Sequence, residues 1–224
     1  MTAKNKIPAK RLLIVDDHPM MRNGLAQLID HEGDLKVVAE ADNAGQALQA
    51  IAKNKFDLAL VDNSLPDKNG LELIKDIRTL KPDLPVLVVS MHDELIYAER
   101  VLRAGARGYI MKQEGGQKFL IAIRQVLAGK VFVSEKMSAR ILENFSGIQT
   151  ENSSSPVQKL SDREFEVFQL IGHGVGTRDI AGRLHLSVKT VEVHRANIKG
   201  KLNLATATEL VRYAVRWLDA QGRS

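Results

Sequence analysis

Short runs of apolar residues alternate with helical patterns through the first half of the chain. The runs are four to six residues long, as expected for strands that are buried on both faces of a sheet, and they lie at residues 11–15, 36–41, 58–61, 85–90 and 108–111. Apolar residues at helical spacing follow each run, around residues 19–29, 44–51, 71–77, 93–104 and 119–127. Five strands alternating with five helices predict an α/β fold with a doubly wound parallel sheet, covered by helices on both faces.

After residue 133 the apolar residues follow helical spacing only. One helical pattern covers residues 134–145, and a polar, Ser-rich stretch at 147–156 then predicts a flexible linker. We therefore predict three segments: an α/β domain at 8–132, a linker helix with a flexible linker at 133–158, and a small all-α four-helix domain at 159–221.

Cap residues indicate where the helices of the small domain begin. Ser161 and Glu164 form a capping box, and Thr177 is expected to cap a short second helix after a glycine-rich break. Ser187 is expected to cap a third helix that runs to Leu202, and a last helix covers 206–220. A short helix, a tight turn and a longer helix predict a helix-turn-helix.

Composition and charge narrow the class of protein. The 224 residues are 44% hydrophobic and 26% charged and include no cysteine, so a disulfide framework and a thiolate metal site are excluded. The longest apolar runs are too short for a signal peptide or a membrane span, and we expect a soluble, cytoplasmic protein with no membrane partner. Residues 156–224 carry 11 Lys and Arg against 7 Asp and Glu, which fits a nucleic-acid partner.

Polar side chains stand where the predicted strands end. Parallel strands joined by right-handed crossovers point the same way, so one edge of the sheet should collect Asp16, Asp17, Asp62, Ser90 and Lys112. Clustered carboxylates suit Mg²⁺, and Asp62 could then act as a nucleophile that forms an aspartyl phosphate. Lys112 would offset charge on the phosphoryl oxygens, and Ser90 could donate a hydrogen bond to one of them. The alternative is a structural Lys–Asp pair at an acidic edge.

The third helix of the small domain has two distinct faces. Val191, Ile198 and Leu202 recur at helical spacing and predict its buried side. The opposite face is small enough to enter a major groove and carries Lys189, Glu192, Val193, Ala196 and Gly200. Three cations beside that face suit DNA phosphates: Arg195, Lys199 and Lys201. The alternative is an ordinary solvated helix face.

Residues 8 to about 130 resemble a receiver domain of a two-component response regulator. The resemblance is carried by Asp16-Asp17, the turn Asp62-x-x-Leu65-Pro66-x-x-x-Gly70, Ser90 and Lys112. It implies a flavodoxin-like fold and phosphorylation of Asp62 by a sensor histidine kinase. It also implies Mg²⁺ held by Asp17, Asp62 and the backbone carbonyl of Ser64, with Asp16 acting through water. Finally, it implies that Ser90 moves toward the phosphate while Tyr109 turns inward.

Residues 159–221 resemble a LuxR-type DNA-binding domain. The motifs are Leu160-Ser161-x-Arg163-Glu164, Ile180-Ala181-x-x-Leu184, Leu186-Ser187-x-x-Thr190-Val191-x-x-His194 and Ile198-x-x-Lys201-Leu202. Together the two domains resemble the NarL/FixJ family across nearly the whole chain. The resemblance makes 187–202 the recognition helix, with base-edge positions at Glu192, Val193 and Ala196. We expect contacts to the DNA backbone from Lys189, Thr190, His194, Arg195 and Lys201, although a core role is equally compatible with His194.

The last helix carries a wide apolar stripe, which consists of Leu210, Val211, Ala214, Val215 and Leu218. The family resemblance implies that this stripe pairs with its copy in a DNA-bound homodimer. The alternative is a core confined to one domain.

These expectations combine into a phosphorylation-dependent transcription regulator that binds double-stranded promoter DNA. The receiver would catalyse only its own phosphorylation and dephosphorylation, so the protein would not be a metabolic enzyme. A phosphohydrolase using Asp62 would need a second aspartate two residues later, where Ser64 stands. The remaining alternative is a constitutive DNA-binding regulator with an idle receiver domain.

Overall fold

The computed structural model describes residues 8–146, 156–184 and 186–221. The chain divides into two compact units, Met1–Ser146 and Gly147–Ser224, which we describe separately. Most of the predicted flexible linker, residues 147–155, lies outside the described residues.

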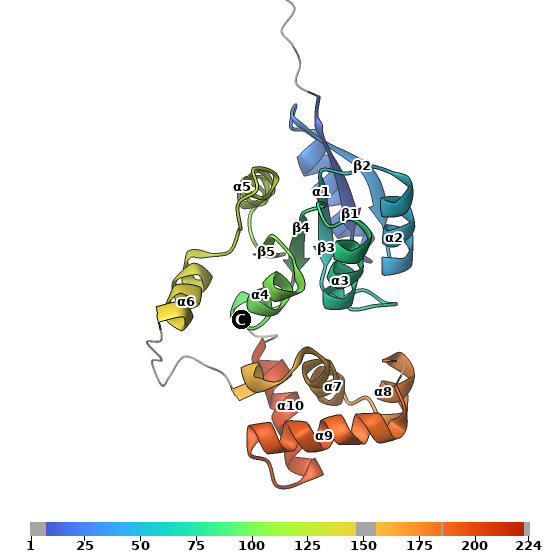
Figure 1. Ribbon diagram of the computed structural model, residues 1–224, viewed down its shortest axis with the longest axis vertical. Coiled ribbons are helices and arrows are strands. Elements are labelled where there is room, and N and C mark those ends of the chain that lie inside the picture. Colours follow the sequence, from blue (N-terminus) through green and yellow to red (C-terminus); the bar gives the residue numbers. More distant parts are fainter. Residues whose placement is uncertain (1–7, 147–155, 185, 222–224) are drawn as a thin grey trace, which may run out of the picture. The chain divides into compact units, whose positions relative to one another are not determined.

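The first unit is built on a five-stranded parallel sheet in the order β2-β1-β3-β4-β5 (Figure 1). Every residue of β3 and β4 is buried, which explains why their sequences are continuous apolar runs rather than alternating ones. The strands are β1 (Lys10–Val15), β2 (Leu35–Ala41), β3 (Leu58–Asp62), β4 (Val86–Ser90) and β5 (Gly108–Met111). The predicted doubly wound α/β sheet is confirmed.

Five helices cover the two faces of this sheet. They are α1 (Pro19–Asp30), α2 (Ala44–Lys53), α3 (Gly70–Leu80), α4 (Glu94–Ala104) and α5 (Gly116–Leu127). Helices α1 and α5 share one core with alternate strand residues such as Leu12, Ile14 and Leu60. Helices α2, α3 and α4 pack in sequence order against one another.

A further helix, α6 (Glu135–Ser146), belongs to this first unit. It packs against α4 and buries Met137 completely. Just before it, Phe132 extends the sheet edge, because the backbone N–H of Tyr109 donates to the carbonyl of Phe132 at 2.9 Å. The expected linker helix is therefore docked on the first unit, which extends to Ser146, while the boundary of the receiver domain at residue 132 stays a prediction.

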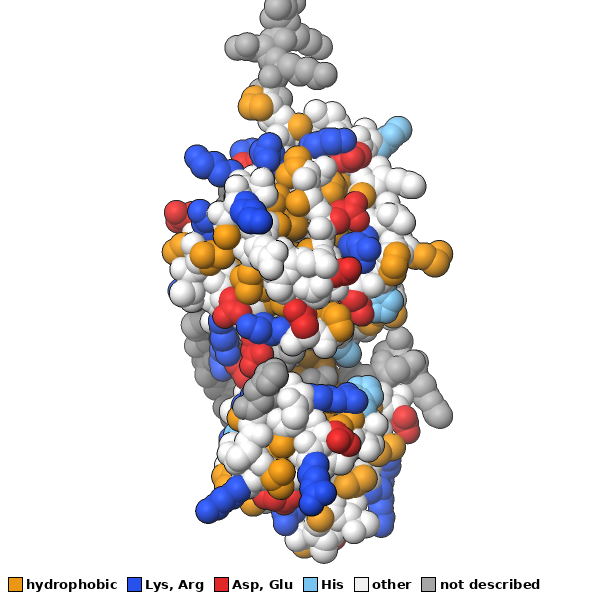
Figure 2. All heavy atoms as spheres, turned by 90° about the vertical axis from the view of Figure 1, so that its right-hand side faces the viewer, with side chains coloured by type: hydrophobic (Ala, Val, Ile, Leu, Met, Phe, Trp, Pro, Cys, Tyr) orange, Lys and Arg blue, Asp and Glu red, His pale blue; other side chains and the backbone are white. Residues whose placement is uncertain are grey.

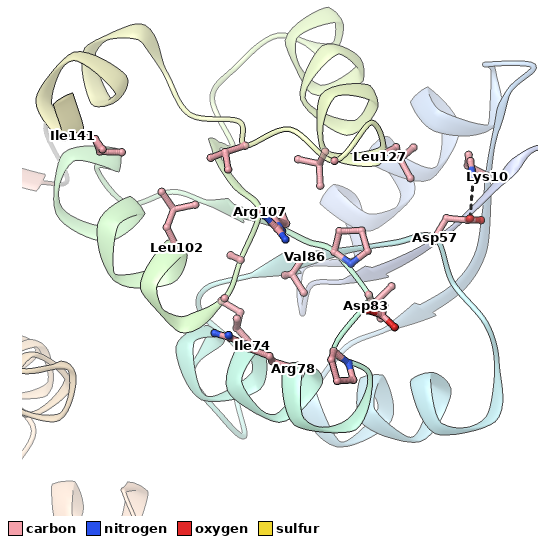
Figure 3. A pocket seen from close by; sticks show the side chains of 18 residues that line it. Lys10, Asp57, Ile74, Arg78, Asp83, Val86, Leu102, Arg107, Leu127 and Ile141 are labelled. Carbon is pink, nitrogen blue, oxygen red and sulfur yellow. Dashed lines mark hydrogen bonds and ion pairs between the residues drawn. The ribbon is translucent and has the colours of Figure 1, made fainter. Parts of the chain in front are cut away.

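A hollow of about 940 Å³ opens at the amino edge of the sheet (Figure 3). Its lining includes the beginning of β4 at Val86 and the last turns of α3 and α4 at Arg78 and Leu102. The predicted chemical residues stand at the opposite, carboxyl edge, so this hollow is separate from them.

The second unit is all-helical. A 3₁₀ turn, η1 (Pro156–Lys159), precedes α7 (Asp162–Gly172), α8 (Thr177–Arg183), α9 (Val188–Leu202) and α10 (Ala207–Gln221). Phe165 and Phe168 of α7 form its centre, and the ring of Trp217 contacts both at centroid distances of 5.6 and 5.5 Å. The predicted four-helix domain is confirmed. Among the residues that the structure describes, no helix is both long and apolar enough to cross a bilayer.

Cap residues mark where these helices begin, and one of the predicted caps is wrong. The capping box predicted at Ser161 and Glu164 is present, and the hydroxyl of Ser187 accepts from the backbone N–H of Thr190 at 3.0 Å. Thr177 is not a cap: the N-cap position is Gly176, and Thr177 is the first helical residue.

Candidate functional site

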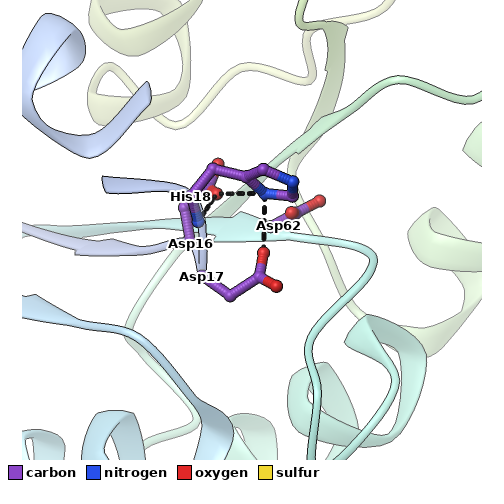
Figure 4. Close-up of side chains that lie close together, drawn as sticks. All are labelled: Asp16, Asp17, His18 and Asp62. Atoms are coloured by element: carbon purple, nitrogen blue, oxygen red, sulfur yellow. Dashed lines mark hydrogen bonds and ion pairs between the residues drawn. The ribbon is translucent and has the colours of Figure 1, made fainter. Parts of the chain in front are cut away.

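Three strand-end carboxylates gather at the carboxyl edge of the sheet (Figure 4). Asp16 and Asp17 directly follow β1, and Asp62 is the last residue of the adjacent strand β3. Asp16, Asp17, His18 and Asp62 each offer a ligand atom, and these atoms all lie within 4.8 Å of one another. Asp16 and Asp62 are each only 2% exposed. The predicted acidic cluster is therefore present, and two of its three carboxylates are buried.

Lys112 joins the cluster from the end of β5. Its ammonium nitrogen lies 2.7 Å from Oδ2 of Asp16 and 2.8 Å from Oδ2 of Asp62. Burial acts to lower the pKa of Lys112, but the two ion pairs outweigh it and raise this pKa. Burial also raises the pKa of Asp62; Lys112 opposes that shift, and neighbouring Asp16 adds to it. The site thus places the Lys112 ammonium between two carboxylates, which favour its charged form.

His18 is a member of the cluster that sequence reasoning missed. Its Nδ1 lies 2.7 Å from Oδ1 of Asp17 and 3.2 Å from Oδ1 of Asp16, although its side chain is 67% exposed. The only signal in the sequence is its place directly after the two acids. The ring lies over the acid pair on its solvent side.

The carboxylate oxygens fit a hard divalent cation. Oδ1 of Asp17 is buried and accepts no hydrogen bond from the described residues. Oδ2 of Asp16 is in the same state, even though it lies 2.7 Å from the Lys112 ammonium, because that contact lacks hydrogen-bond geometry. Buried anionic oxygens with spare lone pairs are the ligands that Mg²⁺ prefers. Ser64 lies beside them, since its N–H donates to Oδ1 of Asp62 at 3.1 Å.

Ser90 and Tyr109 meet at the loop between β4 and α4 rather than at the carboxylates. Ser90 is fully buried, and its hydroxyl accepts from the backbone N–H of His92 at 3.1 Å. Tyr109 is also fully buried and donates to the carbonyl of His92 at 2.7 Å. Burial raises the pKa of Tyr109 well above its ordinary value. Tyr109 is thus already turned inward in this structure.

Helix α9 presents the expected smooth face. Val191, Ile198 and Leu202 are buried, whereas Val193 is 52% exposed. Its predicted neighbours on that face are also exposed: Lys189, Glu192, Ala196 and Gly200. Figure 2 shows Lys and Arg side chains over the lower part of the molecule, where the second unit is drawn, interspersed with a few acidic ones. The side chains predicted to contact bases, Glu192, Val193 and Ala196, are therefore exposed.

Some expected DNA contacts already have partners within the domain. The ammonium of Lys201 lies 2.6 Å from Oε2 of Glu164 on α7. Nδ1 of His194 is buried without a hydrogen bond from the described residues, which favours the core role over a phosphate contact. The hydroxyl of Thr190 lies 2.8 Å from that of Ser187 in the helix cap. Arg195 is 15% exposed and lies 3.9 Å from Glu192.

The apolar stripe of α10 divides into two faces. Leu210 and Ala214 are fully buried, and α10 packs on α7 and α9, which favours the alternative of a core confined to one domain for these two residues. Leu218 packs on α7, because a Cβ on Gly172 would lie 2.5 Å from its Cδ1. Val211 and Val215 are 38% and 36% exposed and remain available to a partner.

Comparison with known proteins identifies both units. Residues 12–124 match the response regulator receiver domain, and residues 158–214 match the bacterial regulatory proteins of the luxR family. The oxygen regulatory protein NreC of Staphylococcus aureus is 37% identical over 92% of this chain and 97% of its own length.

Two solved structures extend the comparison. One is RcsB from Salmonella enterica serovar Typhimurium, bound to promoter rprA in the presence of phosphomimetic BeF₃⁻. The match covers 92% of this chain and 98% of that chain, with a TM-score of 0.72. Because the identity is 24%, this match shows the fold alone. A structure of two RcsB dimers bound to two parallel DNAs covers 92% of this chain and 97% of its own, with 26% identity and a TM-score of 0.57. The chain therefore belongs to the NarL/FixJ family of two-component response regulators, transcription regulators that join a receiver domain to a LuxR-type DNA-binding domain.

Proposed function

We propose that Asp62 accepts a phosphoryl group from a sensor histidine kinase and that this modification controls DNA binding by α9. The observation that carries the proposal is the cluster of Asp16, Asp17, Asp62 and Lys112, in one chain with an exposed recognition helix. A structural Lys–Asp pair alone does not account for Oδ1 of Asp17, a buried carboxylate oxygen that accepts no hydrogen bond from the described residues.

The chemistry at Asp62 is a group transfer. A carboxylate oxygen of Asp62 attacks phosphorus, a P–O bond forms, and the P–N bond to the kinase histidine breaks. The released imidazole nitrogen takes up a proton. Lys112 faces Oδ2 of Asp62 at 2.8 Å, so its charge offsets the negative charge of the incoming phosphoryl oxygens.

Asp16, Asp17 and Asp62 would hold Mg²⁺, with the backbone carbonyl of Ser64 completing the protein ligands. The ion supplies charge neutralisation for the phosphoryl oxygens. His18 lies over Asp16 and Asp17 and would have to turn away to admit it. Beyond this phosphorylation and its own dephosphorylation, we propose no catalysis by the receiver.

Helix α9 would enter the major groove of promoter DNA. Glu192 can accept from a cytosine amino group, and Val193 or Ala196 can contact a thymine methyl. Lys189 and Lys199 would contact phosphates, and Arg195 would join them by leaving Glu192. Because RcsB is described as dimers on DNA, we propose that this chain binds as a homodimer when phosphorylated, in the cytoplasm, through Val211 and Val215 of α10.

A pull-down of genomic DNA fragments tests the proposal. Wild-type protein and Asp62→Asn are compared in Mg²⁺, with and without beryllofluoride as a mimic of the aspartyl phosphate. We expect specific fragments only with wild type plus beryllofluoride, since coupling of about 1–3 kcal/mol changes DNA affinity about 5–150-fold. The same fragments in every lane would leave DNA binding intact and overturn control by Asp62.

A further inference from the structure

The segment Ser90–Leu95, from the end of β4 into α4, makes a series of polar contacts that the phosphorylation chemistry does not use. We call it the switch segment. Its first residue, Ser90, and its third, His92, carry the contacts described above to one another and to Tyr109. The imidazole of His92 also lies 3.0 Å from the hydroxyl of Ser64, two residues after Asp62. The switch segment is therefore tied to the loop that follows Asp62 through the contact between His92 and Ser64.

The other end of the switch segment holds residues 132–140, which we call the arm. Glu94 is 8% exposed, and its Oε1 accepts from the backbone N–H of Ser134 at 2.7 Å. One residue later, the carbonyl of Leu95 accepts from Arg140 at 3.2 Å. A carboxylate is among the stronger acceptors for a backbone N–H, and this one is shielded from water. Two consecutive residues of the segment, Glu94 and Leu95, thus hold the arm at Ser134 and Arg140.

Strand β5 holds the arm on its other side. The backbone N–H of Tyr109 donates to Phe132 at 2.9 Å, and that of Phe132 donates to Arg107 at 3.0 Å. The approach is so close that a Cβ on Gly108 would lie 2.9 Å from the Phe132 carbonyl oxygen. The arm therefore rests on two elements, the switch segment and β5. The switch segment contains Ser90, and β5 contains Tyr109.

We propose that the arm is the output element of the receiver, and that the contact between Glu94 and Ser134 transmits the state of Asp62 to it. The inference rests on the proposed function of Asp62. If Ser90 turns toward a phosphoryl oxygen, the N–H of His92 must follow its acceptor or lose it. Glu94 lies two residues further along the same segment, so its hold on Ser134 changes with that movement. The arm continues through the rest of α6 to Ser146, where the first unit ends.

Two substitutions at Ser134 separate the transmitting contact from simple helix stability. Ser134→Pro removes the N–H that donates to Glu94. Ser134→Ala keeps this N–H and removes only the hydroxyl that accepts from Met137 at 3.1 Å. A second pair acts from the other side: Glu94→Met removes the acceptor, whereas Glu94→Gln keeps an acceptor oxygen. None of these changes touches the carboxylate cluster or α9.

Hydrogen exchange of the full-length protein in Mg²⁺, with and without beryllofluoride, provides the test. We expect wild type, Ser134→Ala and Glu94→Gln to change the exchange of α6 amides about fivefold or more on adding beryllofluoride. Ser134→Pro and Glu94→Met should exchange at one rate in both conditions. The inference is overturned if beryllofluoride leaves the exchange of α6 amides unchanged in wild type. It is also overturned if beryllofluoride still changes this exchange in Ser134→Pro or Glu94→Met.

Peptides covering residues 86–97 distinguish this failure from failure of the proposed function. If these peptides respond to beryllofluoride and α6 does not, Asp62 is a phosphorylation site but the arm does not report it. If neither region responds in wild type, the proposed function fails, and the inference fails with it.

Discussion

Nζ of Lys112 lies 2.8 Å from Oδ2 of Asp62, although their strands, β5 and β3, are separated by β4 in the sheet. The lysine side chain reaches across the end of β4 into a site where both partners are almost fully enclosed: 7% of the lysine side chain and 2% of the aspartate side chain are exposed. This contact fixes the charge balance of the phosphorylation site.

Replacing this lysine should destabilise the receiver strongly. Lys112→Met leaves two buried carboxylates without their cation, which costs about 3–5 kcal/mol of unfolding free energy. Added Mg²⁺ should restore more stability to this variant than to wild type, because it supplies the missing charge. Lys118→Met is the control, since it removes an exposed pair with Glu114 worth about 0.5 kcal/mol at most. Urea unfolding with and without Mg²⁺ measures both, and equal losses would contradict the prediction.

Asp17 should be a direct ligand for Mg²⁺. Its buried Oδ1 accepts no hydrogen bond from the described residues, so Asp17→Asn removes a negative oxygen that has spare lone pairs. Loss of even an outer-shell partner weakens metal binding about 10–100-fold, and we expect at least the lower figure here. Calorimetric titration with Mg²⁺ checks this. Asp83→Asn, at the opposite edge of the sheet, should bind Mg²⁺ as wild type does; a matching loss there would contradict a specific site.

Acid should destabilise the DNA-binding domain through Glu164. Burial alone would raise the pKa of Glu164, but Lys201 and the N–H of Ser161 outweigh it and lower this pKa. A lowered folded pKa means that the stabilisation is complete above the unfolded pKa and is lost as pH falls through the folded one. We expect the unfolding free energy to fall below about pH 5, and to fall less steeply in Glu164→Gln.

The single tryptophan, Trp217, reports this unfolding because it packs on Phe165 and Phe168. Urea titrations followed by its fluorescence at several pH values provide the measurement. Asp219→Asn, which changes an exposed acid near the end of α10, is the comparison variant. Identical pH profiles for wild type and Glu164→Gln would show that Glu164 is not the titrating group.

Two exposed residues of α9 should affect DNA binding differently. Lys189→Ala should weaken binding about equally on all sequences and reduce the salt slope by about one, because a phosphate contact carries no base information. Glu192→Ala should relax the preference at one base pair, by about 1–3 kcal/mol. Anisotropy titrations on an operator and its single-base variants, at several salt concentrations, separate the two. A uniform loss for Glu192→Ala would exclude base contact.

Adjacent residues of α10 should separate dimerisation from folding. Val211→Asp places a charge on an exposed position and should weaken the DNA-bound dimer without unfolding the domain. Leu210→Ala empties a fully buried position and should cost about 2–5 kcal/mol of stability. Sedimentation of the complex with DNA and thermal unfolding measure the two effects. An unchanged dimer in Val211→Asp would move the interface away from this face.

Local sequence signals predicted the elements well where their causes are local. Continuous apolar runs placed the five strands, and the capping box at Ser161 and Glu164 marked the beginning of α7. Thr177 failed as a predicted cap because Gly176 takes the N-cap position. The pair Gly176-Thr177 is compatible with an N-cap at either residue, so only the backbone conformation shows which of the two is the cap.

The sequence by itself determined which groups meet at the carboxyl edge, because parallel strands with right-handed crossovers bring Asp16, Asp62 and Lys112 to the same end. It could not reveal contacts that depend on how distant elements pack. Tertiary structure alone placed His18 over the acids, paired Lys201 with Glu164, and enclosed Leu210. It also docked α6 on α4 through Glu94 and Ser134. Burial and ion pairing depend on two surfaces that pack together, whereas the periodicity of apolar residues describes only one of these surfaces.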